Sequence, residues 1–392
     1  MSEAYIVAAA RTAGGRRNGR LAGWHPADLA AQVLNALIER TDADPALIED
    51  VIMGCVGQAG EQSNNIARNA VMASRLPESV PATSVDRQCG SSQQALHFAA
   101  QAVMSGAMDI VIAAGVESMT RVPMGTPSIL AYKNGLGSYM SPGIVARYPG
   151  VQFSQFTGAE QIALKYGLSR EQLDAYALLS HQRAIAATRA GHFNDEIVPV
   201  AVRLADGSET GEMHTRDEGI RYEATLESIA GVKLIAEGGR CTAASASQIC
   251  DGAAGLMVVN ERGLKILGVK PLARVHHMTV IGHDPVIMLE APIPATQRAL
   301  KKAGMTISDI DLYEVNEAFA PVPLAWLQTL GADPARLNVH GGAIALGHPL
   351  GGSGAKLMTT LVHALGQRGK RYGLQTMCEG GGLANVTIIE RL

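Results

Sequence analysis

A cysteine near the N-terminal end of the chain and a histidine near the C-terminal end have surroundings that suit nucleophilic catalysis. Cys89 precedes Gly90 and a predicted helix over residues 93–104. A thiol at a helix N-terminus faces unpaired amides and the positive end of the helix dipole, which favours the thiolate. Cys89 is therefore a candidate nucleophile, although a buried structural cysteine at a helix cap fits the same residues.

His348 lies between Gly347 and Pro349 in the glycine-rich segment 338–354, and it belongs to no apolar helix face. A nearby imidazole could accept the thiol proton, giving a Cys–His pair assembled from opposite ends of the chain. A phosphate loop is the competing interpretation, because residues 351–356 are also rich in glycine. That segment lacks the Gly-Lys-Ser/Thr ending and follows no clear strand, which argues against a Walker site.

Two further candidates each follow a predicted strand. Cys378 precedes a run of three glycines that includes Gly380, where a backbone amide can meet a ligand, although a structural turn fits equally well. Asn316 either caps the next helix or orients a water molecule or a carbonyl group. We expect structural roles for Cys55, Cys241 and Cys250. No histidine lies at metal-ligand spacing from a cysteine or carboxylate cluster, so we expect no metal site.

The elements that must position these residues alternate between strand and helix patterns, which predicts an α/β fold with mostly parallel sheets. Predicted strands are 5–10, 50–55, 110–114, 256–259, 311–315, 372–375 and 386–389, and predicted helices include 28–39, 94–104 and 169–190. Gly90, Ser92 and Leu96 open one helix-then-strand unit, and the triplet at 351, 353 and 357 opens another at the same spacing. This repeat favours two related halves, with residues 120–248 as a long insertion in the first.

Composition sets the broad class. The chain has 392 residues, 47% of them hydrophobic, and a formal net charge of −3. This length favours more than one domain, and the charge gives no reason to expect nucleic acid or an anionic membrane as partner. The five cysteines are unevenly spaced, unlike a secreted disulfide framework, and no segment reads as a membrane span. We expect a soluble cytoplasmic protein without membrane insertion.

Four segments, in order along essentially the whole chain, resemble the thiolase family. Each is moderately specific alone, whereas all four together in this order are very specific. They are Cys89-Gly90-Ser91, Asn316-Glu317-Ala318-Phe319, Gly341–Gly351 and Cys378–Gly382. Their wording is most similar to that of actinobacterial degradative thiolases, including those of steroid-ring breakdown.

The resemblance implies a thiolase-like fold with two βαβαβ-type halves in a five-layered αβαβα arrangement. It implies an N-terminal half of residues 1–119 plus 249–270, an inserted loop domain of residues 120–248 that binds CoA, and a C-terminal half of residues 271–392. The implied enzyme is an acyltransferase that cleaves 3-ketoacyl-CoA with CoA to acetyl-CoA, or another short acyl-CoA, and a shortened acyl-CoA. The reaction is reversible as a Claisen condensation, and it serves fatty acid or steroid catabolism.

The resemblance also implies a ping-pong mechanism through an acyl group on Cys89. His348 would activate the thiol, and Cys378 would move the proton at the α-carbon of the second substrate. One oxyanion site would combine the His348 imidazole with a water held by Asn316. The other would use the backbone amides of Cys89 and Gly380.

Acyl-CoA and CoA are the implied partners, as substrates rather than as a permanently bound cofactor, and the implied assembly is a homodimer or homotetramer. Candidate residues for CoA and the acyl pocket are Arg221, Ser228, Ser247, Phe156, Thr157, Ala244 and Phe319. Many biosynthetic thiolases have His-Met-Gly where this chain has Phe-Thr-Gly at 156–158. They also have Ala-Gly-Asn-x-Ser where it has Ala-Ala-Ser-Ala-Ser at 243–247. These departures argue against specificity for acetyl groups alone.

Three alternatives remain for comparison. A biosynthetic acetoacetyl-CoA thiolase would share every catalytic motif. A β-ketoacyl synthase shares the fold and the first cysteine, but it uses a second histidine in place of Asn316 and has no counterpart of Cys378. A non-catalytic CoA or lipid carrier on the same scaffold typically loses one of the motifs, and this chain has lost none.

Overall fold

Two four-stranded units with the same strand order form the framework of the computed structural model, which describes residues 2–392. The first has the order β3-β5-β9-β1 and the second the order β11-β12-β13-β10. The strands of the first are β1 (Tyr5–Thr12), β3 (Asp50–Gly54), β5 (Ile110–Ser118) and β9 (Cys250–Val259). Those of the second are β10 (Ala273–Gly282), β11 (Leu312–Val315), β12 (Tyr372–Glu379) and β13 (Leu383–Arg391). The repeat confirms the expectation of two related halves.

Strand directions also repeat. The pairs β3–β5 and β11–β12 are parallel, whereas β9 runs antiparallel to both its neighbours and so does β13. The expectation of mostly parallel sheets is therefore wrong. The last strand of each half enters between two earlier strands in the opposite direction, an arrangement that element order alone does not reveal. A short pairing of β1 with β10 joins the two units edge to edge.

Helices occupy matching places in both halves. The helix α1 (Pro26–Thr41) joins β1 to the next strand, as α10 (Pro292–Ala303) does after β10. The helix α3 (Ser91–Ser105) leads into β5, and α13 (Ser353–Gln367) leads into β12. Two more helices follow the second strand position of each half, α2 (Ile66–Ala73) and α11 (Pro321–Leu330).

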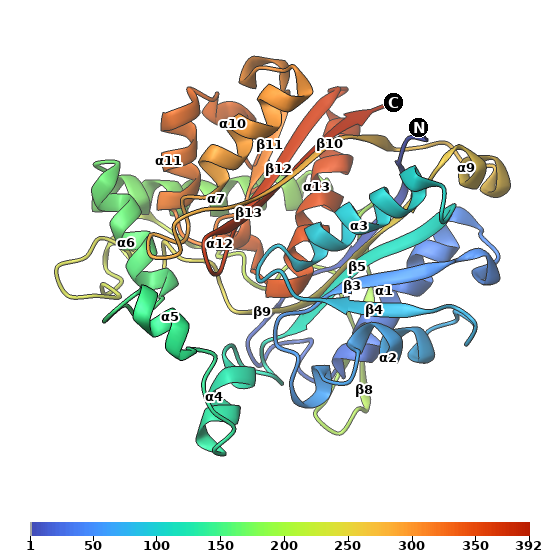
Figure 1. Ribbon diagram of the computed structural model, residues 1–392, viewed down its shortest axis with the longest axis horizontal. Helices are drawn as coiled ribbons and strands as arrows, with labels where there is room; N and C mark the ends of the chain where they lie inside the picture. The colour runs from blue at the N-terminus through green and yellow to red at the C-terminus, as the bar shows by residue number, and fades with distance from the viewer. Residues whose placement is uncertain (1) are drawn as a thin grey trace.

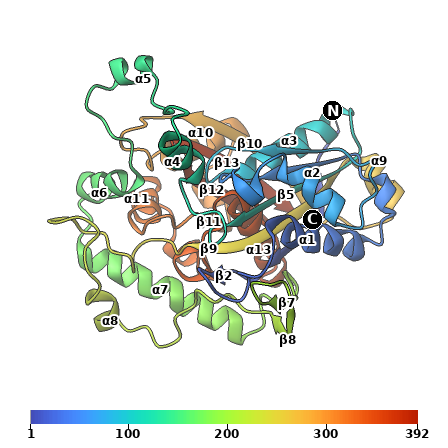
Figure 2. The same cartoon turned by 90° about the horizontal axis from the view of Figure 1, so that it is seen from below.

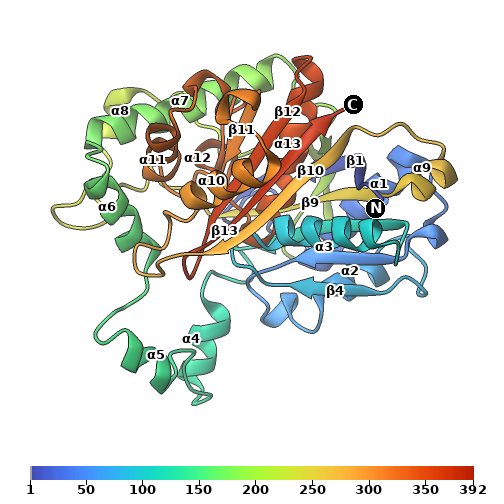
Figure 3. The ribbon, with the colours of Figure 1, turned by 45° about the horizontal axis from the view of Figure 1, so that its top comes forward.

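These elements stack in five layers (Figures 1 and 3). The helices α3 and α13 lie against each other between the two units, where Leu96, Ala99, Met358 and Leu361 share one apolar cluster. On the outside, α1 and α2 cover the first unit, while α10 and α11 cover the second. The expected αβαβα arrangement is confirmed, and it places the N-termini of α3 and α13 in the same layer.

The segment 120–248 departs from this repeat. It contains α4 (Thr126–Lys133), α5 (Pro142–Arg147), α6 (Gln155–Lys165), α7 (Arg170–Arg189), α8 (Leu226–Ala230), and the two-stranded sheet of β7 (Val200–Arg203) and β8 (Glu209–His214). The helix α6 packs on α11, and α7 packs on the short α12 (Ala343–Leu346). Residues 123–150, which carry α4 and α5, project from the body as an arm (Figure 2).

The remaining elements are short. They are β2 (Gly15–Arg16), β4 (Ala82–Val85), β6 (Ile197–Val198), α9 (Glu261–Leu267), and the 3-10 turns Pro45–Leu47, Gly60–Gln62, Ile307–Asp309, Pro334–Arg336 and Leu350–Gly352. Along residues 2–392, every helix is too short or too polar to traverse a bilayer.

Candidate active site

Cys89 lies in a tight turn between β4 and α3. The preceding Gln88 has a φ of 48°, in the left-handed region, and its amide donates to Asp86 Oδ1 at 2.7 Å. Gly90 is the N-cap of α3, and a side chain there would collide with the carboxyl group of Glu379. The turn directs the Cys89 sulfur toward two backbone amides, its own and that of Gly380. Two donors that converge on one reactive atom can also hold an oxyanion formed beside it.

The resting form of Cys89 is the thiol. Burial raises the pKa of Cys89 to about 12, with the nearby Glu379 acting in the same direction. The amides of Cys89 and Gly380 oppose this increase without overcoming it. The expectation that the helix start favours the thiolate is therefore wrong for the resting site, because desolvation outweighs the backbone donors. The proton must leave through a base as the sulfur attacks.

His348 is held by contacts on both sides of its ring. Its Nδ1 lies 2.5 Å from Ser353 Oγ, and that hydroxyl donates to the carbonyl oxygen of Pro349 at 2.9 Å. Because Ser353 has only one hydrogen to donate, it accepts from Nδ1, so the proton is on Nδ1 and Nε2 is unprotonated. The amide Nδ2 of Asn316 lies 3.4 Å from Nε2, on the side where a base would work.

Electrostatics keep the imidazole neutral. Burial, followed by the charge of Lys356, lowers the pKa of His348 to about 3. A neutral imidazole with an unprotonated Nε2 can take a proton from a thiol at neutral pH. His348 therefore has the protonation state that a general base for a thiol requires, and its pairing with Cys89 stays a prediction.

Asn316 follows β11, and its backbone amide donates to Thr376 at 3.1 Å. The helix-cap alternative is wrong, because α11 begins at Pro321 with Ala320 as its N-cap. The side-chain oxygen of Asn316 is buried, with no hydrogen-bond partner within residues 2–392. Its amide group faces His348 and so belongs to the site rather than to the helix.

Cys378 is the second-last residue of β12 and is fully buried. Burial raises its pKa well above the ordinary value, and an ionised Cys89 would raise it further, so the two sulfurs lie near each other. The adjacent Glu379 is also buried, which raises its pKa to about 8 and leaves it mostly protonated at neutral pH. A second thiol beside the first can give or take a carbon-bound proton.

Packing between α3 and α13 brings the distant segments together. The amide of Ala355 donates to Ser92 Oγ at 2.8 Å, which joins the first turns of the two helices. The buried carboxylate of Glu117 accepts from the amides of Gly351 at 2.8 Å and Gly57 at 2.9 Å. It thereby ties the His348 loop to the half that carries Cys89. The matching helix starts read from the sequence thus meet at one place.

A cavity of about 870 Å³ opens beside Cys89 and Gly380. The body and the arm both contribute to its walls, which are largely apolar. Lining side chains include Met119, Val122, Met124, Tyr139, Phe153, Met288, Leu289, Leu350 and Leu383. Cys378, His348 and Asn316 are not among the lining residues.

Several predicted CoA and acyl-pocket residues form a separate group next to Ala318, which lines the cavity. The ring of Phe156 packs edge-on against Phe319 at 5.6 Å, and the Ser247 amide donates to the Ala318 carbonyl at 2.9 Å. Ala244 is half-buried in this region, and Thr157 is exposed on α6. Phe156, Thr157 and Ala244 are not among the residues that line the cavity at Cys89.

Arg221 and Ser228 lie elsewhere, exposed on the inserted segment. The Arg221 amide donates to His181 Nδ1 at 3.2 Å. The Ser228 hydroxyl accepts from the Thr225 amide at 3.0 Å and donates to the Thr225 carbonyl at 2.9 Å. Ser228 therefore already has a local role at the start of α8.

The structure adds residues to the site that were not predicted from the sequence. Ser353 fixes the ring of His348, Glu117 fixes its loop, and Lys356 acts on its charge. The spacing of Ser353, five residues after His348 at a predicted helix start, was a usable signal. Glu117 gave none, because its partners are distant backbone amides. Within residues 2–392 no group of three His, Cys, Asp or Glu side chains could hold a metal ion.

Comparison with known proteins covers almost the whole chain. Residues 4–262 match the family model described as thiolase, N-terminal domain, and residues 269–391 match that of thiolase, C-terminal domain. A Mycobacterium tuberculosis protein named steroid 3-ketoacyl-CoA thiolase FadA6 is 53% identical over 394 residues, covering 100% of this chain and 95% of that protein. Proteins named 3-ketoacyl-CoA thiolase from Cronobacter sakazakii and Erwinia tasmaniensis are each 42% identical and cover 100% of both chains.

Proposed function

The chain belongs to the thiolase family, and we propose that it cleaves 3-ketoacyl-CoA with CoA to acetyl-CoA, or another short acyl-CoA, and a shortened acyl-CoA. One observation carries this proposal: the Cys89 sulfur, faced by two backbone amides, lies beside a cavity and near a second buried cysteine. This arrangement suits transfer of an acyl group to one sulfur and of a proton at the other. The enzyme is an acyltransferase, and the reverse reaction is a Claisen condensation.

In the first half-reaction, His348 Nε2 takes the proton of Cys89 as the sulfur attacks the 3-keto carbon. The oxyanion that forms collapses, and the bond between carbons 2 and 3 breaks. The electron pair of that bond remains on carbon 2 as the enolate of acetyl-CoA, and Cys378 gives it a proton. Acetyl-CoA leaves, and the shortened acyl group remains on Cys89 as a thioester. Two acid–base residues are needed, because one proton leaves the Cys89 sulfur and another is added to carbon 2 in the same half-reaction.

In the second half-reaction, CoA enters and its thiol attacks the acyl thioester on Cys89. Before this step, His348 passes the proton that it took from Cys89 to the Cys378 thiolate, so Nε2 is unprotonated again. His348 then takes the thiol proton of CoA, the tetrahedral intermediate collapses with Cys89 as leaving group, and the proton passes from His348 to the Cys89 thiolate. Proton balance is restored when the Cys89 and Cys378 thiols are regenerated. The amides of Cys89 and Gly380 provide one oxyanion site. The His348 ring, with a water held by Asn316, provides the other.

The favoured substrates carry acyl groups larger than acetoacetyl. A cavity of about 870 Å³ lies in the range that holds drug-sized ligands, far more than a four-carbon group fills. Its apolar walls suit a long aliphatic or fused-ring acyl group. The 53% identity to a protein named as a steroid thiolase supports a ring-containing substrate in steroid or fatty acid catabolism over biosynthetic acetoacetyl-CoA formation.

CoA acts as a substrate, and the inserted segment 120–248 forms the loop domain that receives it, between halves at 1–119 plus 249–270 and at 271–392. The repeated strand order supports this division. Ser247, Phe319, Phe156, Thr157 and Ala244 flank the pantetheine and acyl portion, and Arg221 and Ser228 lie toward the nucleotide end. The enzyme works as a homodimer or homotetramer. Its five unpaired cysteines favour the reducing environment of the cytoplasm.

The test is CoA-dependent cleavage of a panel of 3-ketoacyl-CoA thioesters with short, long and polycyclic acyl groups. The expected result is cleavage of all three classes, with the highest kcat/KM on the larger groups. A higher kcat/KM on acetoacetyl-CoA than on the larger substrates would favour a biosynthetic acetoacetyl-CoA thiolase. Tight acyl-CoA binding without release of acetyl-CoA from any substrate would favour the non-catalytic carrier.

A further inference from the structure

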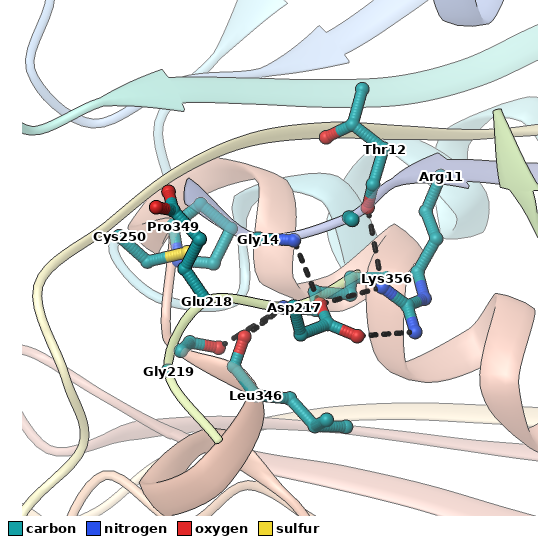
Figure 4. Close-up of polar contacts among 12 residues, drawn as sticks. Arg11, Thr12, Gly14, Asp217, Glu218, Gly219, Cys250, Leu346, Pro349 and Lys356 are labelled. Carbon is teal, nitrogen blue, oxygen red and sulfur yellow. Dashed lines mark hydrogen bonds and ion pairs between the residues drawn. The ribbon is translucent and has the colours of Figure 1, made fainter. Parts of the chain in front are cut away.

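A buried cluster of four charged side chains adjoins the residues that precede His348. Figure 4 shows Arg11, Asp217 and Lys356 of this cluster. Lys356, in the first turn of α13, is only 6% exposed, although it is a cation. Its ammonium group donates to the carbonyl oxygens of Leu346 and Gly347, the two residues that precede His348. A buried lysine is costly unless it is paired and hydrogen-bonded, so these contacts define its position.

The counterion of Lys356 comes from the inserted segment. Asp217 Oδ1 lies 3.6 Å from Lys356 Nζ, and Asp217 also accepts from both terminal nitrogens of Arg11, at 2.9 and 3.1 Å. The Gly14 amide donates to the same carboxylate at 2.7 Å. Glu196 binds Arg11 Nε at 2.6 Å, so two cations face two carboxylates. Burial opposes its ionisation, but Arg11 and Lys356 hold the pKa of Asp217 at about 2.

A second contact joins the same two segments on the other side of His348. The side-chain amide of Gln248 donates to Gly219 and to Ile344, both at 2.7 Å. The backbone carbonyl of Gln248 accepts from the His348 amide at 3.0 Å. The segment 217–219 is thus bound to the loop 344–348 from two directions. It continues directly into Arg221, where we place the nucleotide end of CoA.

We propose that Lys356 and Asp217 are positioning residues for His348, which link the CoA-facing segment 217–221 to the catalytic base. The inference rests on the proposed function, since it assumes the base role of His348. The two carbonyls that Lys356 holds fix the backbone from which the imidazole projects. A displacement of about 1 Å at a reacting group can cost about 100-fold in rate, so holding this backbone matters for turnover.

An ion cluster with a purely structural role would stabilise the fold without contacting the loop that carries His348. Two features separate this cluster from that alternative. Lys356 donates its hydrogen bonds to the two residues directly before His348, and its charge is the second cause, next to burial, of the lowered pKa of that histidine. Asp217, its partner, lies in the inserted segment rather than in the half that carries the loop.

The test compares Lys356→Met, Lys356→Arg and Asp217→Asn with Arg336→Met. Arg336 is a matched control, because its guanidinium also binds two carbonyls, those of Ser308 at 3.2 Å and Ile310 at 2.8 Å, and an aspartate, Asp333, at 3.4 Å. It lies in the C-terminal half and contacts neither His348 nor the inserted segment. The measurements are the rate of Cys89 acylation at saturating acyl-CoA, KM for CoA, and the thermal midpoint.

Lys356→Met is expected to slow acylation at least about tenfold at saturating substrate, because the base is misaligned. Lys356→Arg, which keeps the charge and the donors, should restore most of that rate. Asp217→Asn should lower acylation and also raise KM for CoA, and it serves if Lys356→Met does not fold. Arg336→Met should lower the midpoint yet acylate at the wild-type rate.

Acylation by Lys356→Met and Asp217→Asn at the wild-type rate would overturn the inference while leaving the proposed function intact. So would equal losses in Lys356→Met and Arg336→Met, corrected for folded fraction. Failure of the proposed function gives a different result, since the wild-type protein itself would then cleave no 3-ketoacyl-CoA.

Discussion

Replacement of Ser353 by alanine tests the orientation of the catalytic imidazole. Ser353 Oγ accepts from His348 Nδ1 at 2.5 Å and donates to Pro349 at 2.9 Å. The alanine variant keeps the backbone and the size of the side chain but removes this partner. His348 then loses the contact that sets its tautomer and the orientation of its ring.

The magnitude follows from the charge that develops during the reaction. The resting imidazole is neutral, so the lost bond is worth about 1 kcal/mol, whereas the imidazolium formed during attack makes a bond worth about 1.5–3 kcal/mol. The difference of about 0.5–2 kcal/mol raises the barrier, which slows acylation roughly 2- to 30-fold. The fold of the protein should be affected less than the rate.

The assay is acylation of Cys89 in single turnover, by rapid quench and intact-protein mass spectrometry. Thr296→Val is the matched control, because the Thr296 hydroxyl also accepts from a ring N–H, that of Trp326 at 2.9 Å, and donates to a proline carbonyl four residues earlier at 2.7 Å. The control should lose stability but keep its acylation rate. Wild-type acylation by Ser353→Ala would refute the proposed orientation of His348.

Three further predictions concern charge, stability and substrate size. Burial raises the pKa of Glu379 to about 8, so above pH 8 its negative charge should disfavour the Cys89 thiolate and lower kcat. Glu379→Gln should match the wild type at pH 7 and keep its rate at higher pH; an identical alkaline decline in both proteins would contradict this. Glu317 accepts from Tyr176, Ser180, Asn338 and the Ile344 amide, so Glu317→Ala should lower the free energy of unfolding by at least about 3 kcal/mol in a denaturant titration. A loss below about 1 kcal/mol would show that these donors find other partners. Met124→Trp adds bulk to the arm wall of the cavity and should lower kcat/KM roughly 5- to 150-fold for polycyclic substrates but not for acetoacetyl-CoA. The exposed Met72→Trp should change neither, and equal losses on both substrates would argue against a size effect.

Most of the fold was predictable from local patterns. The strands β5 and β13 and the helices α1 and α3 contain the residues predicted for them, because alternation and helical periodicity report burial directly. Strand direction was not predictable from the order of elements, since β9 inserts between β1 and β5 after the long segment 120–248, and β13 turns back from β12 to pair with β10. The equal spacing of glycine, serine and leucine at the two helix starts was visible in the sequence. The structure shows that these helix starts, at Ser92 and Ser353, pack against each other and bring the two halves together.

The site residues divide in a similar way. Cys89, His348 and Cys378 were predicted because a reactive side chain among glycines is unusual wherever it stands. Their protonation states were not, because burial depends on packing from both halves. Glu117, Asp217 and Lys356 act through backbone groups more than a hundred residues away or through neighbours brought close only by folding, and local spacing carries no trace of that.

Location of the acyl group tests the central claim most directly. Wild-type protein, Cys89→Ala and Cys378→Ala would each be incubated with acetyl-CoA, digested and examined by peptide mass spectrometry. The wild type and Cys378→Ala should carry the acetyl group on Cys89, Cys89→Ala should carry none, and Cys378→Ala should fail in carbon–carbon bond cleavage of 3-ketoacyl-CoA. An acetyl group on Cys378 in the wild type, or full cleavage activity in Cys378→Ala, would contradict the assignment of the two cysteines.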